Sequence, residues 1–294
     1  MKISKYCHCY CWFLSFLFLQ NQHSCMGWIS RALSTALSST SLRTNPIITK
    51  ETFRAYTMSA VTEDISTKKI KSKKDLLRVR QHVNPLAAAY QKPIVLSNGW
   101  IEEAFKDPSL PFHVDIGCAK GVFPLKMAEA DCNRNFLGLE IRRSLVEHAN
   151  EYYKNQKGME NLHYLSCNAN VDLKRILTDI TKSSKLVRVT IQFPDPHFKK
   201  KHHKRRVLKP ELVETIATCL DKDGDLFMQG DIFEVMEEMR LITRENPNLI
   251  DINPDLKEWM EGPESNPLPV ATEREQYVYG KGGNVYRTMF HKKK

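Results

Sequence analysis

From about residue 112 the chain alternates between short apolar runs and longer amphipathic segments. Short apolar runs bounded by Gly, Pro or Asn predict buried strands, and apolar residues spaced three and four apart predict helices. Strands are expected at the start of 112–121 and at 135–140, 162–167, 186–192 and 224–229, and helices at 122–130, 142–155, 170–180, 210–220 and 231–245. Strands that alternate with helices of this length predict an α/β fold with a mostly parallel, doubly wound sheet.

Further elements are expected at both ends of this pattern. A short helix is predicted at 100–105, before the first strand. After the last helix, the segments 275–279 and 284–290 flank a glycine-rich turn at 280–283. They predict a closing pair of strands, with the C-terminal strand antiparallel to the rest of the sheet.

The N-terminal third differs in composition from the rest. Residues 1–50 contain no Asp or Glu and are rich in Ser and Thr, which is typical of an organelle transit peptide. The apolar run 10–19 also resembles a secretory signal, but it is too short to span a bilayer. We favour a transit peptide and an organellar location, the chloroplast before the mitochondrion; translation from Met58 would instead give a cytoplasmic or nuclear protein. The predicted division is an extension at 1–61, a basic arm and lead-in at 62–110, and the α/β domain at 111–294.

Charge and cysteine content narrow the classes of partner. The formal net charge is +10 and the sequence pI is about 9.1, which favours nucleic acid first and an anionic membrane surface second. The eight cysteines include no CxxC pair. Reduced thiols and no structural zinc are therefore expected.

The segment 186–209 carries the strongest local signal. Its apolar start predicts a buried strand, which must end at Pro194-Asp195-Pro196 because two prolines cannot continue a ladder. Asp195 is thus expected on a stiff turn at the carboxyl end of the strand. A basic run follows, formed by Lys199, Lys200, Lys201, Lys204, Arg205, Arg206 and Lys209. This pattern favours a reaction site beside a polyanion docking site; the alternative is a turn followed by solvated charges.

Polar residues also follow the other predicted strands, where ligands bind in an open α/β sheet. They are Asp115, Gly117, Glu140, Asn168, Ala169 and Asp231. The turn at 117–121 lacks the GxGxxG phosphate pattern, and Glu140, about 20 residues on, is placed to bind a ribose diol. Because Asp115 begins this turn, a nucleoside with a positive charge is favoured, and S-adenosylmethionine is preferred over a dinucleotide. An ordinary strand-to-helix turn remains the alternative.

These motifs together resemble the tRNA (guanine-N7)-methyltransferase family. The resemblance rests on DIGCAKG (115–121), GLEIR (138–142), SCNA (166–169), QFPDPHFKKKHHKRR (192–206) and TEREQYV (272–278), and it extends from about Arg78 to Phe290. RVRQHVNPL (78–86) and DIGCAKG are closest to the bacterial-type, single-subunit form, rather than to the eukaryotic form that works with a propeller subunit.

The resemblance implies a Rossmann-like class I methyltransferase fold and methylation of N7 of the guanine at position 46, in the variable loop of tRNA. It implies a methyl-donor site of Asp115, Gly117, Glu140, Ile141, Arg142, Asn168, Ala169 and Asp195, with Asp195 also catalytic, and substrate contacts from Lys199, Asp231, Thr272, Glu273, Arg274 and Glu275. Many relatives have glycine where this chain has Ala119, so the donor loop is expected to differ slightly.

The residues are compatible with that chemistry. Guanine N7 exposes a lone pair and carries no proton, so no strong base is required, and alignment of the reactants is the main task. Asp195 can stabilise the cationic product or accept hydrogen bonds from the guanine N1 and N2 groups. We expect tRNA as the partner, no metal, no membrane, no obligate protein subunit, and a monomer or homodimer. The rival hypotheses are a methyltransferase acting on another RNA or a protein, and a non-catalytic RNA-binding module.

Overall fold

The computed structural model describes residues 82–293. All of them lie in the second of two compact units of the chain, Asp75–Lys294. The predicted transit peptide at 1–61 and the basic part of the arm at 62–80 lie outside the described residues.

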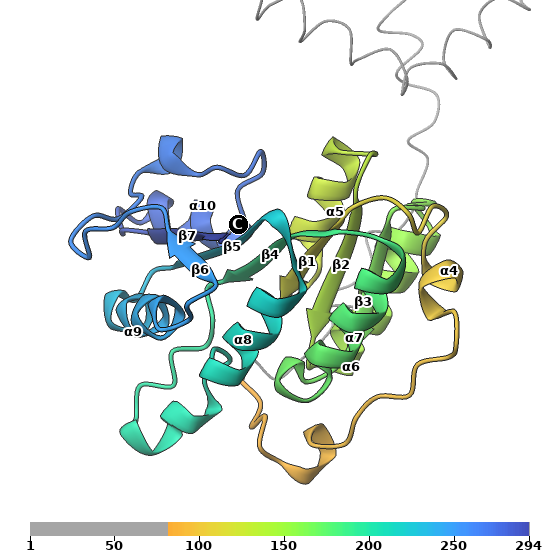
Figure 1. Cartoon of the computed structure of the whole chain (residues 1–294), viewed down its shortest axis with the longest axis horizontal. Helices are drawn as coiled ribbons and strands as arrows, with labels where there is room; N and C mark the ends of the chain where they lie inside the picture. The colour runs from red at the N-terminus through yellow and green to blue at the C-terminus, as the bar shows by residue number, and fades with distance from the viewer. Residues whose placement is uncertain (1–81, 294) are drawn as a thin grey trace, which may run out of the picture. The chain divides into compact units, whose positions relative to one another are not determined.

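Helices and strands alternate through the described chain as the apolar pattern predicts (Figure 1). In order, they are η2 (Ala88–Tyr90), α4 (Trp100–Ala104), β1 (Phe112–Ile116), α5 (Val122–Ala130), β2 (Asn135–Glu140), α6 (Arg143–Ala149), η3 (Asn150–Asn155), β3 (Leu162–Ser166), α7 (Ala169–Ser183), β4 (Leu186–Gln192), η4 (Lys200–Arg205), α8 (Pro210–Cys219), β5 (Leu220–Gly230), α9 (Phe233–Arg244), β6 (Leu249–Asp251), η5 (Pro263–Ser265), α10 (Glu273–Gly280) and β7 (Tyr286–Lys292).

The strands form one seven-stranded sheet in the order β3-β2-β1-β4-β5-β7-β6. Strands β1 to β5 pair in parallel, whereas β7 is antiparallel to β5 and to β6. Strands β2 and β3 extend the sheet from one edge of β1, and the chain then crosses to the other edge, where β4 and β5 follow. Ligands bind at such a switch point, which here lies between β1 and β4. The predicted mostly parallel sheet with an antiparallel C-terminal strand is confirmed.

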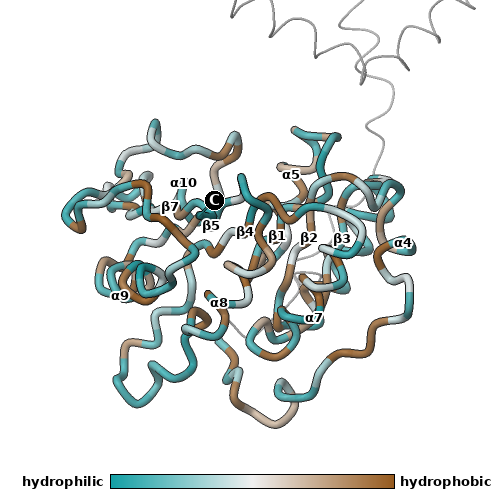
Figure 2. Tube along the Cα trace, viewed as in Figure 1, coloured by the Kyte–Doolittle hydropathy of each residue, from teal (hydrophilic) through white to brown (hydrophobic). Residues whose placement is uncertain are grey.

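Two apolar cores cover the sheet, and neighbouring strand residues alternate between them. Leu137 belongs to the core that also contains residues of α4, α7, α8 and α9, while Phe136 belongs to the core with residues of α5 and α6. This period of two is the strand periodicity seen in the sequence. Figure 2 shows hydrophobic positions along the strands and hydrophilic positions in the outer loops.

The predicted strand at 275–279 is wrong, because this segment belongs to the helix α10. A capping box starts that helix: the Thr272 hydroxyl accepts a hydrogen bond from the Glu275 backbone N–H, and the Glu275 carboxylate accepts one from the Thr272 N–H. This reciprocal pair satisfies two helix-end donors and outweighs the β-propensity of the aromatic residues that follow.

Smaller differences concern the bounds of elements. The strand β6 was not predicted, since three residues are too short for a periodic signal. The strand β5 begins at Leu220, four residues before the predicted start at 224. The helix expected at 142–155 divides into α6 and a π-helical turn, η3.

Candidate active site

A cavity of about 780 Å³ lies at the carboxyl ends of the central parallel strands. Its lining includes every residue predicted for the methyl donor: Asp115, Gly117, Glu140, Ile141, Arg142, Asn168, Ala169 and Asp195. It also includes Asp231, Thr272, Glu273 and Arg274 from the predicted substrate set. The common edge of the sheet brings these residues together, although they are spread over more than 150 positions of the sequence.

The turn after β1 has an unusual backbone. Gly117 and Gly121 have φ of +84° and +79°, and Ala119, between them, has φ of +50°. Alanine in the left-handed region costs about 1 kcal/mol, which glycine would avoid. Position 119 thus has a left-handed backbone although it holds an alanine.

Asp115 is a buried carboxylate directly below this turn. Its Oδ1 atom accepts hydrogen bonds from the Thr190 hydroxyl at 2.6 Å and from Gln192 Nε2 at 3.2 Å. Burial raises the pKa of Asp115 to about 6; the two hydrogen bonds oppose this, and the charge of Glu140 adds to it. Within residues 82–293, no hydrogen bond to the second oxygen, Oδ2, is found, and Asp115 lines the cavity.

Glu140, at the end of β2, is fixed by the backbone and by its neighbour. Its two oxygens accept hydrogen bonds from the Ala119 N–H at 3.0 Å, the Arg142 N–H at 2.9 Å and the Arg142 guanidinium at 2.9 and 3.1 Å. The hydrogen bonds with Glu140 raise the pKa of Arg142. A ribose diol at Glu140 must therefore share this carboxylate with Arg142 or displace its side chain.

Residues 82–96 form a strap that lies along α7 and reaches the cavity. Asn168 caps α7, and its side-chain Nδ2 donates to the carbonyls of Pro85 and Tyr90 at 3.2 and 3.0 Å. The Ile94 N–H donates to the buried carboxylate of Asp172 at 3.0 Å. The strap was missed from the sequence, because its polar contacts join residues about 80 positions apart.

The turn that carries Asp195 is conformationally strained. Phe193 and His197, on either side of Pro194-Asp195-Pro196, have φ of +48° and +44°. Bulky residues rarely adopt this region, and such strain concentrates at functional sites. The surrounding contacts hold it: the Phe193 N–H donates to the Gln229 carbonyl at 2.7 Å, and Arg206 Nε donates to the Pro196 carbonyl at 3.0 Å.

Asp195 itself contacts the strap. Its Oδ2 lies 2.6 Å from Nδ1 of His82, and its Oδ1 accepts from the His197 N–H at 3.3 Å. About one third of the Asp195 side chain is exposed, at 32%. The sequence predicted the stiff turn correctly but gave no sign of the histidine contact.

A second, smaller hollow of about 340 Å³ adjoins Asp195. It is lined by His82, Val83, Asn84, Asp195, Pro196, His197, Phe198, His202 and Arg205. Asp195 also lines the larger cavity, so it stands where the two hollows meet. The Phe198 side chain is 72% exposed beside this hollow.

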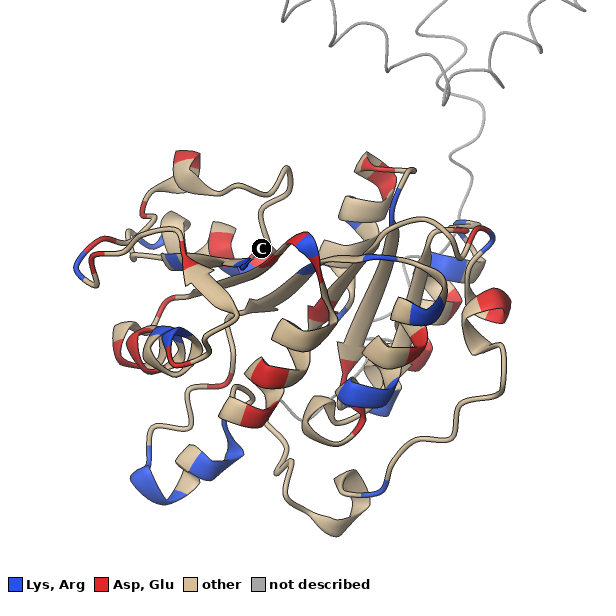
Figure 3. Ribbon diagram, viewed as in Figure 1, with Lys and Arg blue, Asp and Glu red and all other residues tan. Residues whose placement is uncertain are grey.

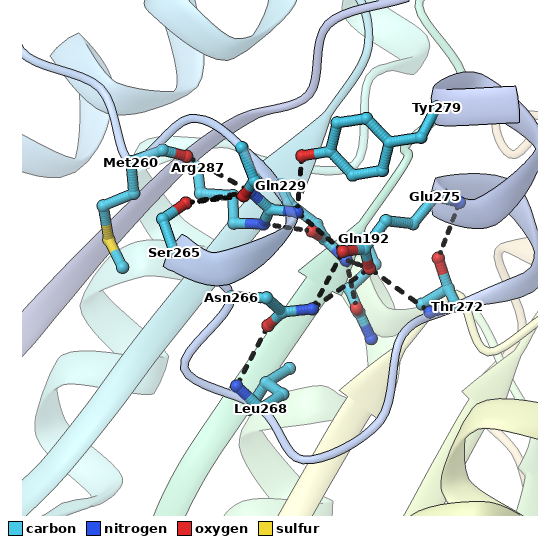
Figure 4. Close-up of polar contacts among 11 residues, drawn as sticks. Gln192, Gln229, Met260, Ser265, Asn266, Leu268, Thr272, Glu275, Tyr279 and Arg287 are labelled. Carbon is cyan, nitrogen blue, oxygen red and sulfur yellow. Dashed lines mark hydrogen bonds and ion pairs between the residues drawn. The ribbon is translucent and has the colours of Figure 1, made fainter. Parts of the chain in front are cut away.

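The predicted substrate residues divide into three groups. Thr272, Glu273 and Arg274 line the cavity, and Arg274 forms a 2.5 Å ion pair with Asp231. Glu275 is only 2% exposed, is absent from the lining, and forms an ion pair with the buried Arg287 at 2.6 Å (Figure 4). Lys199 is exposed just before η4, outside the lining. For all of these residues the substrate role stays a prediction.

The basic run is largely exposed and forms the 3-10 helix η4 and its flanks. Figure 3 shows Lys and Arg gathered along η4. Lys200, Lys201 and Lys204 are exposed, whereas Arg206 is partly buried and forms an ion pair with Glu238. Arg206 therefore holds the Asp195 turn against α9 rather than offering its charge to a polyanion.

Residues 82–293 lack two further features, a metal-binding cluster and a membrane-spanning helix. They contain no group of three or more His, Cys, Asp or Glu side chains placed to hold a metal ion. None of their helices is long and apolar enough to cross a membrane.

Comparison with known proteins gives concordant matches. Residues 109–288 match a family model described as "Putative methyltransferase". The tRNA (guanine-N(7)-)-methyltransferase of Nostoc sp. is 49% identical over 216 residues, which cover 74% of this chain and 94% of that protein. The protein of the same name from Thermosynechococcus vestitus is 48% identical over 217 residues, 74% of this chain and 96% of that protein. A solved 16S rRNA methyltransferase, KamB, shares 14% identity over 68% of this chain and 96% of that chain, with a TM-score of 0.45.

Proposed function

The chain belongs to the tRNA (guanine-N7)-methyltransferase family, and from this membership we infer that it transfers a methyl group from S-adenosylmethionine to N7 of a guanine in tRNA. One structural observation supports this most directly. Asp195, on its strained turn, stands between a large cavity that suits the donor and a smaller hollow beside the basic run. A donor and an acceptor base could therefore meet at this one carboxylate.

The residues of the large cavity fit the donor. A Cβ atom added at Gly117 would meet no atom within 4 Å, so the turn leaves open space against its backbone. Asp115 offers a carboxylate oxygen to the ammonium group, and Glu140 offers a carboxylate to the ribose. A volume of about 780 Å³ lies within the usual range for small-molecule sites, roughly 300–1,000 Å³.

The protein's part in the reaction is to orient the reactants and stabilise charge. The donor supplies an electrophilic methyl group on sulfur, and N7 supplies the electron pair. No residue has to remove a proton from N7, so the arrangement requires no nucleophilic side chain. As N7 becomes part of a cationic ring, the carboxylate of Asp195 stabilises the developing positive charge, or fixes the base by accepting hydrogen bonds from its N1 and N2 groups.

The acceptor base has to leave the tRNA fold to reach Asp195. Turning a nucleotide out costs a few kcal/mol, which contacts around the smaller hollow would offset. The exposed lysines of η4 are placed to contact the adjacent phosphates. We assign the target to the guanine of the variable loop, as the resemblance implies.

We also propose that the enzyme works without a second type of subunit and acts in an organelle, the chloroplast before the mitochondrion. The first proposal is supported by the match to bacterial relatives over 94 to 96% of their length. The second rests on the acid-free, Ser-rich composition of residues 1–50. Imaging of the full-length chain fused to a fluorescent protein, beside a fusion that starts at Met58, tests the location.

The reaction is tested by incubating the purified chain with unmodified tRNA and S-adenosylmethionine, followed by mass spectrometry of the nucleosides. A new 7-methylguanosine peak is expected from tRNA, with none from mixed ribosomal RNA. Labelling of other RNA or of protein would favour the rival enzyme hypotheses. Absence of both product and donor binding would contradict the assignment.

A further inference from the structure

A chain of polar side chains crosses the sheet from the lining of the large cavity, where Gln192 lies partly buried, to the fully buried Gln229 and Arg287. It joins Gln192 on β4, Gln229 on β5 and Arg287 on β7, which occupy directly paired positions on these neighbouring strands (Figure 4). Gln229 Nε2 donates to Gln192 Oε1 at 2.7 Å, and Arg287 Nε donates to Gln229 Oε1 at 2.9 Å. At its other end the chain reaches Asp115, through the 3.2 Å bond from Gln192 Nε2. The proposed function does not account for this arrangement.

The direction of every hydrogen bond in this chain is fixed by Arg287. A guanidinium can only donate, so Gln229 must present its oxygen to Arg287 and its NH₂ group to Gln192. Gln192 must then accept with its oxygen, which leaves its own NH₂ group facing Asp115. Glu275 supports the same polarity, since its carboxylate accepts from both Gln229 and Arg287, at 3.2 and 2.6 Å.

On the opposite side of Asp115, a second series of hydrogen bonds also donates toward its carboxylate. The Thr190 hydroxyl gives its single proton to Asp115 Oδ1, so it must accept from Nε2 of His113, 3.0 Å away. That tautomer leaves Nδ1 of His113 without a proton, and Nδ1 is among the described buried atoms that have no partner. Two donors thus converge on Oδ1 of Asp115, and Oδ2 is left to the cavity.

We propose that Gln192 and Gln229 are positioning residues that, oriented by Arg287, hold the buried side chain of Asp115 as an ionised acceptor for the ammonium group of the methyl donor. The inference rests on the proposed function, and it assigns to the two glutamines a role in donor binding that acts through Asp115. A carboxylate in a buried site loses water, so fixed donors from the protein must replace it.

The bond from Gln192 lowers the pKa of Asp115 and so opposes the effect of burial. Its removal raises the pKa above about 6, toward neutral pH. Asp115 then spends more time as the neutral acid and binds an ammonium group less well. The other titratable groups around Asp115 are Glu140, Cys118, Tyr164 and His113. The pKa values of Cys118, Tyr164 and His113 are shifted by burial toward the uncharged forms, which leaves Glu140 as the charged neighbour.

The test is calorimetric binding of S-adenosylhomocysteine, which keeps the ammonium group, to the full chain between pH 5.5 and 8.5. The variants are Gln192→Met and Gln229→Met, which keep the side-chain length but remove the amide. Gln276→Met, at an exposed position of α10, is the matched control. Because Gln229 is fully buried, its variant can fail to fold; Gln192, which is only partly buried, then carries the test.

For the wild type, affinity should fall as the pH drops through about 6. In the Gln192 variant the midpoint should rise by about one pH unit, which corresponds to the loss of one hydrogen bond to a charged group. At pH 7 its affinity should be lower than that of the wild type by about twofold, at pH 6 by about fivefold, and at pH 8.5 the two should be nearly equal. Gln276→Met should follow the wild-type curve.

A loss of affinity by the same factor at every pH, or unchanged binding, would overturn the inference while leaving the proposed function intact. Absence of binding by the wild-type chain would overturn both.

Discussion

At the scale of single residues, Asp195 and Asp115 are two carboxylates of one cavity in contrasting environments. Asp195 is partly exposed on a strained turn, whereas Asp115 is buried on a strand and held by two donors. The first can meet a reacting base, and the second can only meet a ligand that enters the cavity. This difference suits a division into catalysis and donor binding.

Asp195→Ala should lower turnover by about 100-fold or more, because a preorganised charge beside the reacting atoms is removed. Affinity for tRNA should change by less than about twofold, since a carboxylate contributes nothing favourable to phosphate binding. Single-turnover kinetics and filter binding measure the two quantities. Asp223→Ala removes an exposed acid from the start of β5 as a control. A parallel loss of tRNA affinity would contradict the catalytic role.

Asp115→Asn should stabilise the ligand-free protein at pH 8. The folded pKa of about 6 exceeds the unfolded value of about 3.9, so the folded state binds the proton more tightly and loses stability as the pH rises from about 4 to 6. Asparagine avoids that ionisation, and the gain should be about 1–3 kcal/mol at pH 8 and small at pH 4. Urea unfolding at both pH values tests this, with Asp223→Asn as the control. Donor binding should weaken in the same variant.

At the scale of elements, the glycine turn between β1 and α5 shows how packing restricts a backbone. A Cβ at Gly121 would lie 2.6 Å from a ring carbon of Tyr164, whose hydroxyl also donates to the Gly121 carbonyl at 2.6 Å. At Gly158, which also has positive φ, a Cβ would meet nothing within 4 Å.

Gly121→Ala should therefore destabilise the protein by about 3 kcal/mol, from overpacking together with backbone strain. Gly158→Ala should destabilise the protein by only about 1 kcal/mol, since it adds backbone strain from the positive φ but no overpacking. The free energies of unfolding in denaturant decide between them. Equal costs would show that the packing of Tyr164 against the turn is not tight.

The element η4 is expected to contact tRNA by charge alone. Lys200→Ala combined with Lys201→Ala should weaken tRNA binding and reduce the slope of log Kd against log salt by about 1.5, because two phosphate contacts are lost. Turnover at saturating tRNA should be unchanged. Lys185→Ala with Lys222→Ala removes the same charge near the amino ends of β4 and β5, far along the strands from the cavity. If both pairs had the same effect, binding would not be localised to η4.

The segment 275–279 was predicted as a strand but forms part of the helix α10. The residues Tyr277, Val278 and Tyr279 favour a strand on propensity. Thr272 and Glu275, three positions apart, carried the stronger helix signal, and the capping box could have been recognised from the sequence. The burial of Glu275 against Arg287 could not, because its partner lies on another element.

At the scale of the whole molecule, two neutral histidines, the buried His113 and the partly buried His163, link stability to pH. Burial lowers the pKa of His113 well below its usual range, and burial together with the charge of Lys154 lowers that of His163 to about 3. The unfolded chain takes up protons at these sites below about pH 6.5 while the folded chain does not. Unfolding free energy should therefore fall as the pH decreases from about 6.5 toward 3, by up to about 1.4 kcal/mol per pH unit for each group.

His163→Gln should reduce the slope of unfolding free energy against pH by up to about 1.4 kcal/mol per pH unit, since glutamine does not titrate. His291→Gln, at an exposed position, should leave it unchanged. Chemical denaturation at several pH values between 4 and 7 measures the slope. An unaltered slope in His163→Gln would show that His163 does not contribute to the linkage.

The sequence by itself determined most of the order of strands and helices, the edge of the sheet at which the site lies, and the residues expected to bind the donor, all of which line the cavity. Periodicity is a local property, and the carboxyl ends of parallel strands share one edge whatever their spacing in the chain. Only the tertiary structure decided how those residues are used. It brings His82 into contact with Asp195, and it pairs Glu275 with Arg287. It also binds the Arg206 guanidinium to the turn that carries Asp195, so that this charge is not offered to a polyanion. Each of these contacts joins residues from separate elements or turns, and no local pattern encodes such a pairing.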